Sequence, residues 1–138
     1  MVKYILALFF LFCTTQISLA AHTPGREIVQ IRIDESGRSD DESENVKKGC
    51  QDFKVTIDDV KNFFLKAWPV PLKFNVHERY SPCYAKGFIE FNDNTRGKWK
   101  ISSSGGAILW WDTGDTAALF YNNYKWTDPF ENMYGSEG

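Results

Sequence analysis

The sequence predicts an α+β fold in which one helix packs on an antiparallel meander of four or more strands, with one disulfide. Residues 56–68 carry an amphipathic helical pattern. Short strand-like runs separated by tight turns fill most of residues 84–121. Two cysteines, Cys50 and Cys83, remain once a secretory leader is removed. Closely spaced strands joined by tight turns form hairpins, and consecutive hairpins build an antiparallel sheet.

The helix is predicted from its cap, its apolar stripe and its end. Thr56 is a good N-cap, and Asp59 three residues later completes a capping-box pattern. One helical face then gathers apolar residues at the expected spacing: Val60, Phe63, Phe64 and Ala67. Pro69 and Pro71 stop the helix. We expect this stripe to be core, because a membrane-surface helix would carry more cationic charge on its polar face.

Strand-like runs cover residues 27–33, 72–76, 84–91, 97–101, 107–111 and 116–121. The run at 97–101 alternates, so Trp99 and Ile101 should face the helix while its lysines face solvent. The run AILWW at 107–111 is apolar throughout, so one of Trp110 and Trp111 must leave the helix-covered side. Its cover could be residues 27–33 or 126–130. Without a cover, an exposed aromatic patch marks a binding site.

The N-terminus has the pattern of a secretory leader. Lys3 precedes the apolar run ILALFFLF, and the small residues Ser18 and Ala20 fit a signal peptidase, so we place cleavage after Ala20. The apolar run is too short to span a bilayer. We therefore expect the mature chain, Ala21–Gly138, in the periplasm or the medium and not attached to a membrane.

The cysteines follow from this compartment. Cys13 leaves with the leader, and Cys50 and Cys83 are predicted to pair in an oxidising environment. The alternative is a reactive Cys83 with His77 as its base. A thiolate nucleophile is a poor choice where thiols are oxidised.

Three parts are predicted along the chain: a leader at 1–20, a strand with an acidic linker at 21–49, and a single α+β domain at 50–138. The linker is inferred from residues 34–49, which hold six carboxylates and show no apolar periodicity before Val46. These carboxylates lack the fixed spacing of an EF-hand loop, so no metal site is expected there.

Charge and motifs exclude several functional classes. The formal net charge is −2, and loss of Lys3 makes it −3, so there is no basic excess for nucleic acid. The sequence contains no HExxH, GxSxG, P-loop or GxGxxG motif. Its two histidines are His22, near the mature N-terminus, and His77. We expect no enzyme, metal or cofactor; the alternative is an unrecognised hydrolase using His77 or carboxylates.

From Phe53 onward the layout is a capped helix, SPCYAKGFIEFND at 81–93, GKWKI at 97–101 and KWTDPF at 125–130. This layout resembles a loosely defined group of small exported proteobacterial proteins of unassigned function. That group often carries further cysteines near the last strand, where this chain has Phe120, Tyr121 and Asn123. The resemblance implies structural roles for Cys83 and Trp99 and no catalytic residue.

These features predict a non-catalytic protein-binding module of the bacterial envelope. The most specific versions of this prediction are a toxin-immunity protein and an inhibitor of a secreted hydrolase. In either case the acidic segment at 34–49 could contact a basic partner. The alternative is a glycan or peptidoglycan binder that stacks sugar rings on exposed aromatic side chains. The candidate binding residues are Trp110, Trp111, Asp112 and Trp126.

Overall fold

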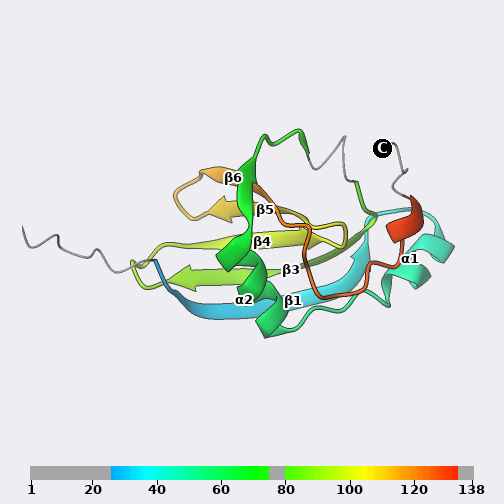
Figure 1. Ribbon diagram of the computed structural model, residues 1–138, viewed down its shortest axis with the longest axis horizontal. Coiled ribbons are helices and arrows are strands. Elements are labelled where there is room, and N and C mark those ends of the chain that lie inside the picture. The colour runs from blue at the N-terminus through cyan, green and yellow to red at the C-terminus, as the bar shows by residue number, and fades with distance from the viewer. Residues whose placement is uncertain (1–25, 75–79, 134–138) are drawn as a thin grey trace, which may run out of the picture.

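A six-stranded antiparallel sheet with one helix across a face and a second helix at one end forms the fold, in agreement with the α+β prediction (Figure 1). The computed structural model describes residues 26–74 and 80–133. The elements are β1 (Ile28–Ser39), α1 (Glu44–Cys50), α2 (Ile57–Lys66), β2 (Trp68–Val70), β3 (Cys83–Phe91), β4 (Arg96–Ser102), β5 (Gly106–Trp111), β6 (Thr116–Phe120) and η1 (Glu131–Met133). The predicted leader at 1–20, His22 and His77 lie outside the described residues.

The strand order in the sheet is β1-β3-β4-β5-β6-β2, and every neighbouring pair is antiparallel. Strands β3 to β6 form the predicted meander, while β1 and β2 add an edge on either side. Figure 1 shows α2 crossing one face of this sheet, with the β3–β4 and β5–β6 turns at one end and α1 at the other. Among the described residues, no helix is both long and apolar enough to cross a membrane.

Helix α2 begins at the predicted cap. The Thr56 side chain accepts the Asp59 N–H at 3.1 Å, and an Asp59 carboxylate oxygen accepts the Thr56 N–H at 2.8 Å. The helix ends at Lys66, two residues earlier than predicted, because Ala67 adopts an extended conformation. The chain then pairs with β6 as β2, where Pro69 is tolerated on an edge strand.

The predicted strand at 72–76 is not found in its described part. Residues 71–74 form a turn in which the Phe74 N–H donates to the Pro71 carbonyl at 2.9 Å. Residues 75 and 76 lie outside the described ranges. The extended segment in this region is β2 instead, because Pro69 and Pro71 disfavour helical backbone at the residues before them, Trp68 and Val70.

The core lies between α2 and the sheet, as the alternation in β4 predicts. Trp99 and Ile101 are fully buried, and the Phe64 ring meets the Trp99 ring edge-on at 6.2 Å between centroids. The Trp99 indole N–H donates to the Phe88 carbonyl at 3.0 Å, so its polar atom is satisfied. Burial of this single large side chain ties β4, β3 and α2 together.

The segment after β6 closes the core on the same side as α2. Trp126 is 8% exposed, and its indole N–H donates to the Ser103 carbonyl at 2.9 Å. The Ser103 hydroxyl donates to the buried Asp128 carboxylate at 2.8 Å. The Trp126 ring centroid lies 6.1 Å from that of Phe63. Trp126 and Asp128 are therefore buried on the α2 side, and this segment does not cover the second face of the sheet.

The predicted disulfide is confirmed. Cys50 and Cys83 are joined by an S–S bond of 2.07 Å, with their Cα atoms 5.1 Å apart. Both residues are fully buried. The bond fastens the last residue of α1 to the first residue of β3.

The predicted acidic linker at 34–49 is wrong. Strand β1 continues through this segment to Ser39, which pairs with Cys83, and residues 44–50 form α1. Gly37 is buried with φ +65°, and a Cβ there would lie 3.0 Å from two carbonyl oxygens, so glycine permits this close approach. Residues 28–39 of the predicted linker region thus belong to the same sheet as the later strands, and residues 44–49 belong to α1.

Candidate binding surface

Within residues 26–74 and 80–133, much of the face of the sheet opposite α2 has no helix or strand packed over it. Strand pairing and alternation place one set of side chains on it, and none of them is buried: Arg32, Tyr84, Lys86, Phe88, Lys98, Lys100, Ile108 and Trp110. We call this set the open face. Neither predicted cover lies over it, because residues 28–33 form an edge strand and residues 126–128 pack on the α2 side.

The open face is closed at its β6 edge. Ala118 and Phe120 point to the same side as Trp110 but are only 4% and 7% exposed. The rings of Phe74 and Trp68 contact Phe120 edge-on, with centroids 5.0 and 5.4 Å away. The accessible part of the face therefore runs from β1 to β5.

Trp110 and Lys98 lie side by side in this accessible part, on the side next to β6. They are direct cross-strand partners on β5 and β4, where side chains on one face contact each other. Trp110 is 44% exposed. A hollow of 430 Å³ adjoins the pair and is lined also by Tyr84, Lys86 and Lys100.

Most cations of the open face already have partners. Lys100 Nζ lies 3.0 Å from an Asp40 oxygen and 4.0 Å from the centre of the Tyr84 ring. Lys86 Nζ lies 3.4 Å from Glu35. Lys98 makes no ion pair within the described part of the chain, which leaves it the cation best placed to meet an acidic group from outside.

Asp40 should titrate below its ordinary range. The hydrogen bond from Lys100 is the largest cause that lowers its pKa, and the Tyr84 hydroxyl adds a second hydrogen bond at 3.0 Å. Because the pKa of Asp40 is lower in the folded state, its ionised carboxylate stabilises the fold at pH values above the unfolded-state pKa of about 4. That contribution is lost as pH falls through the native pKa.

We expect Lys100→Met to raise the pKa of Asp40, because it removes the hydrogen bond from Lys100. An NMR titration of the Asp40 carboxyl carbon measures this pKa. A pKa at or above 3.8 in the wild type would contradict the contact.

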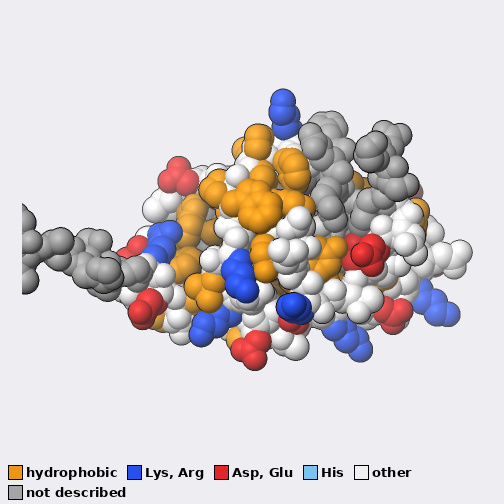
Figure 2. Space-filling model, in the orientation of Figure 1, with side chains coloured by type: hydrophobic (Ala, Val, Ile, Leu, Met, Phe, Trp, Pro, Cys, Tyr) orange, Lys and Arg blue, Asp and Glu red, His pale blue; other side chains and the backbone are white. Residues whose placement is uncertain are grey.

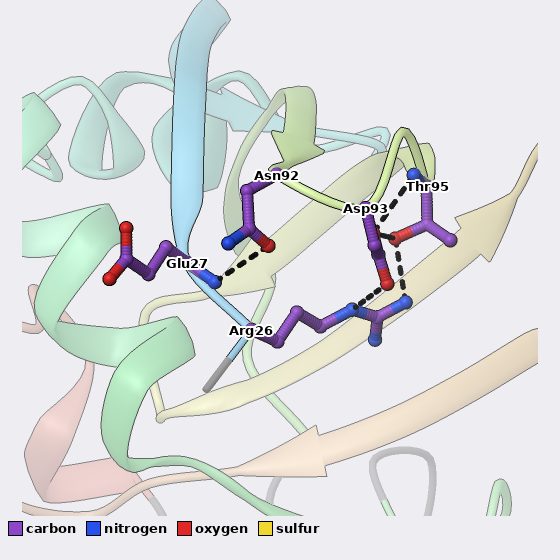
Figure 3. Close-up of polar contacts among 5 residues, drawn as sticks. All are labelled: Arg26, Glu27, Asn92, Asp93 and Thr95. Atoms are coloured by element: carbon purple, nitrogen blue, oxygen red, sulfur yellow. Dashed lines mark hydrogen bonds and ion pairs between the residues drawn. The ribbon is translucent and has the colours of Figure 1, made fainter. Parts of the chain in front are cut away.

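A second polar cluster lies at the turn end of the sheet (Figure 3). The Arg26 guanidinium donates to an Asp93 oxygen at 3.1 Å and to the Thr95 hydroxyl at 2.6 Å. The Glu27 N–H donates to the Asn92 side-chain oxygen at 3.1 Å. These bonds fasten the residues before β1 to the β3–β4 turn. Hydrogen bonds from Thr95, and then the charge of Arg26, hold the pKa of Asp93 below its usual value.

The aromatic floor of this cluster is made by Trp111 and Phe91. Their ring centroids are 5.7 Å apart, and the Arg26 guanidinium carbon lies 4.7 and 4.6 Å from the two ring centres. Asp112 starts the β5–β6 turn and pairs with Arg96, whose Nε lies 3.2 Å away. Arg26, Arg96, Trp111 and Asp112 therefore share one site.

The four predicted binding residues do not form a single surface. Trp111 and Asp112 meet at the turn end, and Trp110 lies on the open face. Trp126 is buried in the core, so it offers no surface to a ligand. Sequence reasoning missed Arg26, because its partners lie more than sixty residues away, and it missed Lys98 as a partner of Trp110, because only the β4–β5 register pairs them.

Comparison with known proteins gives no functional assignment: no family model matches the chain, and neither does any curated protein or solved structure. The resemblance to small exported proteins thus rests on its sequence motifs alone. Within residues 26–74 and 80–133, no three His, Cys, Asp or Glu side chains cluster as metal ligands would.

Proposed function

We propose that the protein is an exported, non-catalytic binding module that holds another protein on its open face. The observation that carries the proposal is Trp110, which stays 44% exposed beside Lys98 on a face that neither α2 nor residues 126–128 cover. Tryptophan is enriched among the residues that dominate protein interfaces. An exposed aromatic side chain flanked by polar ones is the expected centre of such an interface.

The scaffold beneath this face supports the proposal. The other side of the sheet is sealed by α2 and residues 126–128, and a buried disulfide ties α1 to β3. A rigid, pre-formed surface loses little conformational freedom on binding. The disulfide also agrees with export, since disulfides persist in the periplasm and outside the cell. The partner would then be another exported protein, such as a toxin or a secreted hydrolase.

The acidic segment at 34–49 was expected from its composition to meet a basic partner, but two of its carboxylates bind lysines of the sheet. Glu35 and Asp40 are engaged by Lys86 and Lys100 of the sheet itself. These internal pairs use the carboxylates that a basic partner would need. Recognition by the open face therefore favours a partner that brings an apolar side chain to Trp110 and an acidic one to Lys98.

The test is affinity capture with matched variants. The oxidised exported chain is immobilised and exposed to envelope extracts of its producer and of neighbouring strains. The wild type should retain one protein at near-equal stoichiometry. Trp110→Ala should weaken that complex by about 30-fold, the equivalent of a loss of about 2 kcal/mol at an interface centre. Lys98→Glu should also weaken it, most strongly at low salt.

Leu65→Ala is the control, because Leu65 is 61% exposed but lies on α2, away from the open face. It should capture the partner as the wild type does. No retained protein, or equal capture by wild type and Trp110→Ala, would contradict the proposal.

A further inference from the structure

The turn end of the sheet contains a hollow of 520 Å³ that the proposed function does not use. Pockets for small molecules have volumes of about 300–1,000 Å³. Three separate parts of the chain line it: Arg26 before β1, Thr95 and Arg96 around the β3–β4 turn, and Trp111, Asp112 and Asp115 around the β5–β6 turn. The hollow is lined by neither Trp110 nor Lys98, on which the proposed function rests, so an inference about it stands independently of that proposal.

Two guanidinium groups and three carboxylates surround this hollow, which leaves one negative charge in excess. Arg26 pairs with Asp93 at 3.1 Å and Arg96 pairs with Asp112 at 3.2 Å. Asp115 accepts a hydrogen bond from the Thr113 hydroxyl at 3.2 Å. No positive charge is left over to attract phosphate or sulfate, which are bound by clustered cations in excess. The site therefore disfavours an anionic ligand.

The hollow is lined by the aromatic ring of Trp111 and by hydrogen-bond donors and acceptors that lie next to one another. Trp111 is partly exposed on the hollow, and its ring is held by Phe91 and Arg26. Guanidinium N–H groups stand next to carboxylate oxygens and threonine hydroxyls. Each hydroxyl of a sugar both donates and accepts a hydrogen bond, while the C–H face of its ring is apolar. Paired donors and acceptors can bond the hydroxyls of a sugar, and the neighbouring indole can contact its apolar C–H face.

We infer that this hollow is a binding site for a neutral oligosaccharide, with Trp111 contacting a sugar ring and Asp112 and Arg96 bonding its hydroxyls. In this role Arg26 is a positioning residue, because it holds Trp111 against Phe91 and joins the residues before β1 to the β3–β4 turn. Trp110 has no part in the site, since it lies on the other face of β5.

The tryptophan indole signals of the ¹⁵N-labelled chain test this inference. Cellotetraose, maltotetraose and chitotetraose are titrated separately, and the five indoles are assigned by single Trp→Phe variants. At least one tetrasaccharide should shift the Trp111 signal saturably. Trp99 and Trp126 serve as internal references, because their N–H groups bond carbonyls in the core.

Two variants make the test specific. Asp112→Asn removes one carboxylate at an exposed position and should weaken tetrasaccharide binding at least tenfold. Asp52→Asn, an exposed carboxylate beside α1 at the far end of the sheet, should leave the affinity unchanged. The inference is overturned if no tetrasaccharide shifts Trp111, if Trp110 shifts in its place, if Asp112→Asn binds as the wild type does, or if inorganic phosphate saturates the site.

Discussion

Replacing Cys50 or Cys83 with alanine will lower the free energy of unfolding by about 3–4 kcal/mol in the chain-entropy model of a crosslink. The bond joins residues separated by 33 positions, so its loss frees a long loop in the unfolded chain. Both side chains are fully buried, and alanine avoids placing an unpaired hydroxyl there. The result will be read from urea unfolding of the oxidised wild type and the variants.

The double variant separates a shared bridge from two independent cysteines. If both residues act only through one bond, each single variant loses the whole bond and the double variant loses little more. The reduced wild type should then match the single variants. Clearly unequal single costs, or costs that add in the double variant, would argue that each cysteine contributes mainly through its own packing.

Gly87→Ala will cost about 3 kcal/mol, because it overpacks a site with no room for a Cβ. An added Cβ would lie 1.8 Å from the carbonyl oxygen of Arg32 on β1 and 2.7 Å from the Trp99 ring. The first contact is with backbone, so no rotamer change relieves it, and β1 must move away from β3. Urea unfolding followed by circular dichroism gives the cost.

Gly114→Ala is the informative comparison for this prediction. Gly114 has φ +97°, yet a Cβ there would meet no atom within 4 Å. Its cost comes only from the backbone conformation and should be about 1–2 kcal/mol. Equal costs at the two positions would mean that the close approach of β1 and β3 at Gly87 is not maintained in solution.

Figure 2 shows an apolar area on the side of the molecule that faces the viewer in Figure 1, near the α2 and β6 labels. Large exposed apolar side chains on α2 and in the segment after it include Ile57, Leu65, Trp68 and Leu72. Trp68 packs against Phe120 and Tyr121, which gives it a structural role at the sheet edge.

Features set by neighbouring residues were predictable from the sequence. The capping box of α2 depends on two residues three positions apart, and the dry face of β4 depends on alternation within five residues. The disulfide needed only a count of cysteines and a compartment. In each of these cases the physical cause lies within the segment or has a single possible partner.

Features set by distant partners were not predictable in the same way. The acidic segment looked solvated because its partners are remote: Asp40 bonds Lys100, sixty residues later. The choice between Trp110 and Trp111 was open because either alternation satisfies the local pattern. Pairing of Leu109 with the buried Trp99 decides it, turning Trp111 toward the core side and Trp110 toward the open face.

The central claim, that the open face holds a partner protein, is tested most directly by hydroxyl-radical footprinting of the captured complex. Oxidation of each side chain is measured by mass spectrometry with and without the partner. We predict a several-fold drop in oxidation at Trp110, with unchanged rates at Leu65 and at Met133, which is 72% exposed. Protection of Leu65 with no change at Trp110 would contradict the claim and place the partner on the α2 side.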